Sequence, residues 1–178
     1  ANAEGWSQLR VPAETTGRRI AVLGGGPAGL ACAAGLIERG HSVDLYDRKT
    51  DLGGMIQSVI PPERQGESLR AEIEAVFKDV PEDRLGLKLG ADLGADIDLE
   101  RIMADGYDAA FIGIGLPRAT GLSVEDRPAG VWNALDFLRE AKSDAATMNL
   151  AGQDVAVIGG GNTAMDAALT AVRLGARD

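Results

Sequence analysis

Two glycine-rich stretches have the residue types and spacing that suit contact with a phosphate group. In the first, Gly24, Gly26 and Gly29 form the pattern G-x-G-x-x-G; in the second, Gly159 and Gly161 begin G-x-G-x-x-A. Where such a turn joins a strand to a helix, bare backbone can approach a pyrophosphate, and N–H groups at the helix start can donate to it. Each stretch therefore predicts a nucleotide-binding turn.

The surroundings of the first turn carry more weight than the glycines, because glycine makes up 24 of the 178 residues. The apolar run 18–24 is typical of a strand buried on both faces, and residues 27–40 predict a helix. The next strand, 41–47, ends at Asp47, where an acid would accept hydrogen bonds from ribose hydroxyls. The alternative is that Asp47 only ends a strand and the glycines only permit close packing.

The second turn again lies between a buried strand and a helix, with Ala164 in the third glycine position. Asn162 and Thr163 stand where the helix begins, and either could cap it or contact a ligand. Asp166, in the predicted first turn, would be favoured by the helix dipole without any function. The residue at the tip of the following strand, which distinguishes NAD from NADP, is not in the sequence.

The remaining pattern alternates strands and helices. It predicts a loop over 50–62, a helix over 67–78, a strand or hairpin arm over 84–93, a helix over 98–106, a strand over 107–115, a helix over 130–145, a strand over 153–159 and a helix over 162–175. We expect an α/β protein: a lead-in segment (1–17), a Rossmann-like domain with a parallel sheet and flanking helices (18–150), and the start of a second Rossmann-like domain (151–178).

Composition excludes several classes of protein. The net charge of −9 argues against nucleic-acid binding, and no apolar run approaches the roughly 20 residues that span a bilayer. The single cysteine, Cys32, cannot form an internal disulfide or hold an iron–sulfur cluster, and it is expected to pack as a small apolar residue. His41 is expected to have no chemical role. No secretory signal begins the sequence, and a cytoplasmic location is expected.

Together these segments resemble the flavin- and pyridine-nucleotide-dependent family typified by the small (β) subunit of glutamate synthase, which includes the corresponding part of dihydropyrimidine dehydrogenase. The stretch "VLGGGPAGLACAAGLIERGHSVDLYDR" resembles the FAD fingerprint, and "DLGGMIQSVIPPER" the glycine-pair loop. "YDAAFIGIGLPR", "GVWNALDFLREA" and "VAVIGGGNTAMDAALTAVRLGARD" resemble the strand near FAD, the crossover helix and the NADPH fingerprint. The likeness covers residues 18–178 almost continuously.

The resemblance implies a role for residues of both turns. It places Gly24, Gly26, Pro27, Ala28 and Gly29 on the FAD pyrophosphate, Asp47 and Arg48 at the adenosine ribose, Gly54 and Met55 at the ribityl or flavin end, Arg64 on the cofactor, Leu93 beside the adenine and Gly115 close to FAD. It places Gly159, Gly161, Asn162, Thr163 and Ala164 on NADPH or NADH. No metal ligand and no catalytic side chain are expected.

The sequence also departs from the family. Gln65 and Gly66 follow Arg64 where the family commonly has Leu-Pro, and the cysteine-rich iron–sulfur segment often found upstream is missing. The rest of the NAD(P)H domain and the returning FAD segment are missing too. The chain is therefore expected to be the front part of a longer flavoprotein.

The expected function is an FAD-dependent oxidoreductase that takes hydride from NAD(P)H and passes electrons to a partner subunit or an iron–sulfur protein. One alternative is a non-catalytic nucleotide-binding or assembly module. Another is a dehydrogenase that binds a single NAD at the first turn and uses the second turn for packing. The sequence does not reveal the electron acceptor, the substrate, the oligomeric state or the choice between NAD and NADP.

Overall fold

The computed structural model describes residues 9–64, 69–116, 128–143 and 148–177. Contacts divide the chain into two compact units, residues 1–57 with 67–115, and residues 58–66 with 116–178. The short segment 58–66 thus belongs to the unit that holds the second glycine turn. The division into nucleotide-binding domains at residues 150 and 151 remains a prediction.

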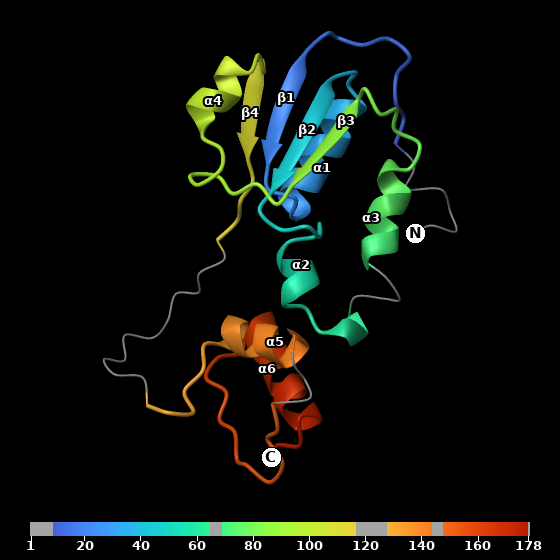
Figure 1. Cartoon of the computed structure of the whole chain (residues 1–178). Helices are drawn as coiled ribbons and strands as arrows, with labels where there is room; N and C mark the ends of the chain where they lie inside the picture. Colours follow the sequence, from blue (N-terminus) through green and yellow to red (C-terminus); the bar gives the residue numbers. More distant parts are fainter. Residues whose placement is uncertain (1–8, 65–68, 117–127, 144–147, 178) are drawn as a thin grey trace. The chain divides into compact units, whose positions relative to one another are not determined.

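The first unit is built on a four-stranded parallel sheet (Figure 1). Its strands are β1 (Arg19–Leu23), β2 (Ser42–Asp47), β3 (Leu85–Leu89) and β4 (Ala109–Ile112), in the order β3-β2-β1-β4. The segment predicted as a strand or hairpin arm is therefore a parallel strand. From β1 the chain adds β2 and then β3 on one side of β1, whereas β4 pairs with the other side of β1. The direction of winding therefore reverses between β1 and β4, which places a topological switch point at their carboxyl ends.

Helices cover both faces of this sheet, as the Rossmann-like prediction requires. The helices of the unit are α1 (Pro27–Ile37), α3 (Leu69–Phe77) and α4 (Leu99–Ala104), and the short α2 (Met55–Ser58) begins in it. Successive strand residues point to opposite faces of the sheet, so each face has its own hydrophobic core. Val22 and Leu45 pack with Ile37 of α1 on one face, and Leu23 packs with Ile102 of α4 on the other. The α/β fold class is confirmed.

A buried polar network ties the strands together on the α4 side. The Asp44 carboxylate of β2 accepts hydrogen bonds from the Arg19 guanidinium of β1 (2.6 Å) and from the Tyr107 hydroxyl (2.7 Å). Tyr107 also shares a hydrogen bond with Tyr46 (2.8 Å), and the Arg19 guanidinium lies 4.1 Å from the centre of the Tyr107 ring. Burial, with these hydrogen bonds, raises the pKa of the Tyr107 hydroxyl, so it stays protonated and donates.

We expect Tyr107→Phe to destabilise the chain by about 1–2 kcal/mol, because the buried Asp44 carboxylate loses a donor. Urea unfolding followed by circular dichroism measures the loss. Nucleotide affinity is expected to stay unchanged, because Tyr107 precedes β4 and so lies at the amino end of the sheet. Unchanged stability would show that Arg19 alone satisfies Asp44.

The second unit contains η2 (Pro62–Arg64), α5 (Ala134–Ser143) and α6 (Asn162–Arg173). Val59 packs with Phe137 and Leu138 of α5 and Ala167 and Ala171 of α6 in one core. The helix predicted from residue 130 starts later than expected, because the Asn133 side chain accepts a hydrogen bond from the Leu135 N–H and so begins the helix there.

The strand predicted over 153–159 does not form in the structure. Only one parallel bridge, between Asp154 and Arg177, is present there, and Ile158 is 83% exposed. A strand needs a neighbour along its whole length, and the described part of this unit supplies a partner at one position. The helix that follows is confirmed as α6.

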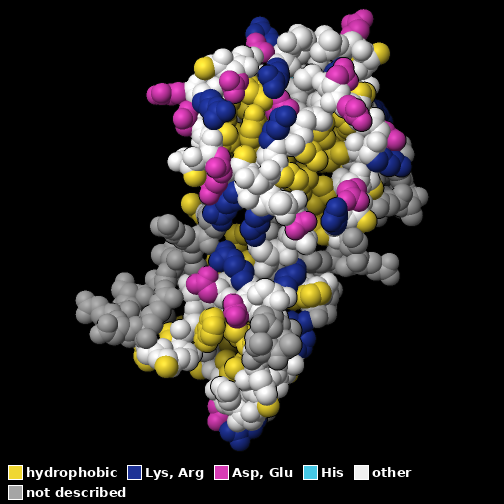
Figure 2. All heavy atoms as spheres, in the orientation of Figure 1, with side chains coloured by type: hydrophobic (Ala, Val, Ile, Leu, Met, Phe, Trp, Pro, Cys, Tyr) yellow, Lys and Arg dark blue, Asp and Glu magenta, His cyan; other side chains and the backbone are white. Residues whose placement is uncertain are grey.

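Acidic and basic side chains are interspersed over the face shown in Figure 2, with apolar side chains between them. Among the helices of the described residues, none is both long enough and apolar enough to cross a membrane.

Candidate nucleotide-binding site

The first glycine turn lies at the switch point of the sheet, directly after β1. Gly24 has φ 109°, a conformation that favours glycine, and its N–H donates to the Tyr46 carbonyl of β2 (2.7 Å). A Cβ on Gly24 would overlap the Gly113 carbonyl, and the Gly113 N–H donates to the Leu23 carbonyl (2.7 Å). The segment after β4 therefore packs against the turn itself.

The other two glycines of the motif have different surroundings. A Cβ on Gly29 would overlap the carbonyl oxygen of Gly24, so only glycine fits there. A Cβ on Gly26 would meet only the Gly54 Cα, at an ordinary 3.9 Å, and Gly26 has φ −77°. Gly26 is the N-cap of α1, with no side chain capping it, and Pro27 and Ala28 are exposed. The open helix start suits a diphosphate.

Asp47 reaches the turn from the end of β2. One carboxylate oxygen accepts from the Gly25 N–H (2.7 Å), and the other accepts from the Lys49 N–H (2.8 Å). The structure thus brings the predicted acid beside the predicted glycines, half-buried, while Arg48 is exposed. Contact of Asp47 and Arg48 with a ribose stays a prediction.

The glycine-pair loop lies against the same turn. The Gly53 N–H donates to the Gly25 carbonyl (2.8 Å), and Gly54, with φ 57°, would place a Cβ only 2.9 Å from the Gly26 Cα. Met55 begins α2 and is 36% exposed. The loop and the turn therefore form one continuous backbone surface, and contact of Gly54 and Met55 with the ribityl or flavin end stays a prediction.

The remaining predicted contacts of the first unit are more scattered. Gly115, with φ 69°, directly follows Gly113 and Ile114, the residues that pack on Gly24. Leu93 is half-buried against the Ile102 and Tyr107 core, on the loop that follows β3. Their contacts with FAD stay predictions.

The second turn, in the other unit, also combines a glycine of positive φ with a helix start that no side chain caps. Gly159 has φ 132°, and a Cβ there would lie 3.5 Å from the Ala164 Cβ. The N-cap of α6 is Gly161, and no side chain caps it. Capping by Asn162 or Thr163 is therefore wrong; both side chains are exposed, and ligand contact is the alternative that remains.

Arg64 and Asp166 form an ion pair in this second unit. Nη1 of Arg64 lies 2.6 Å from a carboxylate oxygen of Asp166, whose side chain is only 10% exposed. Asp166 is the fifth residue of α6 and does not lie in the first turn, where the sequence predicted it. Its buried negative charge is therefore balanced by Arg64 and not by the helix dipole. The Arg64 guanidinium was predicted to contact the cofactor, and that contact stays a prediction.

We expect Arg64→Ala to destabilise α6 by about 2 kcal/mol, because it leaves the Asp166 carboxylate buried without this partner. Hydrogen exchange of the α6 amides measures the effect. Arg70→Ala is the matched control: it breaks the exposed Arg70–Glu74 pair, which solvent screens, and is expected to leave stability nearly unchanged. Equal effects of the two variants would contradict a structural role for Arg64.

Comparison with known proteins agrees with this geometry. The family model for pyridine nucleotide-disulphide oxidoreductases matches residues 18–178. The chain is 33% identical to the "Glutamate synthase [NADPH] small chain" of Escherichia coli (strain K12), over 97% of this chain and 38% of that protein. It is 37% identical to the "NADP(+)-dependent formate dehydrogenase subunit beta" of Moorella thermoacetica, over 93% of this chain and 23% of that protein.

The fold is shared with histamine dehydrogenase from Rhizobium sp. 4-9, with a TM-score of 0.66 at 20% identity, covering 94% of this chain and 26% of that one. The chain thus spans well under half the length of the proteins that it matches. The predicted resemblance to the small subunit of glutamate synthase is confirmed. On the match over residues 18–178, the chain belongs to the pyridine nucleotide-disulphide oxidoreductase family, a family of redox enzymes.

Proposed function

We propose that the first unit binds FAD, with its diphosphate at the Gly24–Gly29 turn. The observation that carries this proposal is the convergence of the glycine turn, the Asp47 carboxylate and the Gly53–Gly54 loop at the switch point of a parallel sheet. Open α/β sheets bind ligands in this position. The residues fit the group, because Gly26 presents bare backbone and Asp47 presents an acceptor for ribose hydroxyls.

Each group at the turn has a distinct task in this proposal. The N–H of Gly26 and the free N–H groups at the start of α1 donate to the diphosphate, and the helix dipole favours its charge. Asp47 orients the adenosine ribose, and Gly54 allows the loop to follow the cofactor towards its ribityl end. When bound, the flavin supplies the hydride and electron transfer; the protein supplies position and electrostatics.

The second turn is proposed to bind NADPH or NADH, with Gly159, Gly161 and Ala164 against its diphosphate and Asn162 and Thr163 as polar contacts. Its support is the positive backbone angle of Gly159 (φ 132°), which favours glycine, and the uncapped helix start at Gly161. The complete protein would take hydride from the nicotinamide and pass electrons to a partner subunit or an iron–sulfur carrier, in the cytoplasm. The relatives named for NADPH and NADP(+) support this proposal.

The test is to load the purified chain with FAD, remove unbound flavin and add NADPH or NADH without oxygen. The expected result is a yellow protein with one bound flavin, whose absorbance the nicotinamide nucleotide bleaches when the rest of the NAD(P)H domain is present. Bound flavin that is not bleached in the complete protein would favour a nucleotide-binding module over a redox enzyme. Binding of NAD without FAD would favour a single-nucleotide dehydrogenase.

A further inference from the structure

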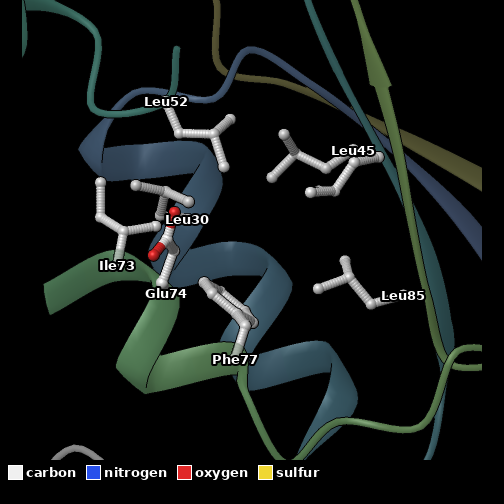
Figure 3. A pocket seen from close by; sticks show the side chains of 8 residues that line it. Leu30, Leu45, Leu52, Ile73, Glu74, Phe77 and Leu85 are labelled. Atoms are coloured by element: carbon white, nitrogen blue, oxygen red, sulfur yellow. The ribbon is translucent and has the colours of Figure 1, made fainter. Parts of the chain in front are cut away.

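A small apolar cavity of about 70 Å³ lies between α1, α3 and the strands β2 and β3 (Figure 3). Leu30, Ile73 and Phe77 line it from the helices, and Leu85 lines it from β3. Leu52, from the loop before Gly53, points into it (Figure 3). The cavity is far smaller than the roughly 300 Å³ at which ligand pockets begin, so its lining serves packing.

Leu52 connects this apolar packing to the glycine turn. A Cβ built on the buried Gly25 would overlap Cδ2 of Leu52, so this methyl group occupies the space beside the Gly25 Cα. On the far side of the loop, a Cβ on Gly53 would lie 3.5 Å from Cδ1 of Ile73. The loop is thus held between α3 and the turn, where the Gly53 N–H donates to the Gly25 carbonyl (2.8 Å).

The hydrogen bond from the Gly53 N–H to the Gly25 carbonyl also fixes the direction of the next N–H group, that of Gly26. In a planar trans peptide, the C=O of one residue and the N–H of the next point in opposite directions. Fixing the Gly25 carbonyl towards Gly53 therefore turns the Gly26 N–H to the opposite side. Within the described part of the chain, the Gly26 N–H makes no hydrogen bond of its own, so it is available as a donor.

We infer that Leu52 is a positioning residue of the first turn: lying beside Gly25 and lining the same apolar cavity as Leu30 and Ile73, it holds the Gly53 N–H on the Gly25 carbonyl and so presets the Gly26 N–H for a diphosphate. This inference rests on the proposed binding of FAD at the turn. Its advantage to binding is preorganisation, because a donor already in place loses no freedom when the ligand arrives.

Two variants of the full chain separate positioning from packing. Leu52→Ala and Leu85→Ala remove the same side chain from the same cavity, but only Leu52 contacts Gly25. Both are expected to lower the melting temperature. Titration with FAD is expected to give about tenfold weaker binding for Leu52→Ala and a change within about twofold for Leu85→Ala, since only the first loosens the donor. The conservative Leu52→Met is expected to restore most of the affinity.

A second measurement needs no ligand. In ¹H–¹⁵N spectra of the FAD-free chain, the Gly26 amide signal is expected to move in Leu52→Ala and to stay in place in Leu85→Ala. An unmoved Gly26 signal, or equal FAD affinities for the two variants, would overturn the positioning role. A wild-type chain that binds no FAD would overturn the proposed function, whatever the Gly26 signal shows.

Discussion

Gly29→Ala is expected to destabilise the first unit by about 3 kcal/mol. The new methyl group would overlap the carbonyl oxygen of Gly24. That atom belongs to the backbone between β1 and α1, so it cannot move aside as a flexible side chain would, and overpacking a rigid site commonly costs 1–3 kcal/mol or more. Urea unfolding followed by circular dichroism measures the loss.

Gly35→Ala is the matched control, in the same helix. A Cβ there would meet only the exposed tip of the Arg39 side chain, at 3.3 Å, which donates to the Gly35 carbonyl (2.7 Å) but, as the end of a flexible side chain, can move aside. Since alanine favours a helix interior over glycine, this variant is expected to be neutral or more stable by up to about 1 kcal/mol. Equal destabilisation by both variants would mean that α1 does not pack against the turn as the structure shows.

Gly26→Ala is expected to weaken FAD binding by about tenfold or more while leaving stability within about 0.5 kcal/mol of the original. The backbone angle of −77° suits alanine, and the nearest atom to the new Cβ is 3.9 Å away. The methyl group would instead lie where a diphosphate must approach the backbone. Quenching of flavin fluorescence during titration, together with a thermal melt, measures both effects.

Gly35→Ala again serves as the control, because it adds a methyl group to α1 away from the turn. It is expected to bind FAD as the original chain does. If Gly26→Ala lost stability and affinity in proportion, the loss of binding would reflect unfolding and not a blocked approach.

The first glycine turn was predictable because the residues that form it lie close together in the sequence. The strand, the turn and the helix are consecutive, and the acid at Asp47 ends the next strand, so a parallel pairing of β1 with β2 is enough to place Asp47 beside Gly25. The pattern also predicted a loop over residues 50–62, but its role near the cofactor came only from the family resemblance. Nothing in the local sequence indicates that the Gly53 N–H donates to the Gly25 carbonyl.

Contacts between distant segments were not predictable. The ion pair of Arg64 with Asp166 joins a segment after the glycine-pair loop to a helix near the end of the sequence, and no spacing rule links them. The position of Leu52 beside Gly25 was not predicted, because it depends on how the loop before Gly53 folds back against the turn. The strand predicted over 153–159 failed for the opposite reason: its local pattern is strong, but pairing needs neighbours.

The central claim, that the main-chain amides of the first turn hold a diphosphate, is tested most directly by residue-resolved titration of the ¹⁵N-labelled chain with ADP. The amide signals of Gly25, Gly26, Ala28 and Gly29 are predicted to move most, and to saturate together. Saturation with the largest changes elsewhere, and none at these four residues, would contradict the account.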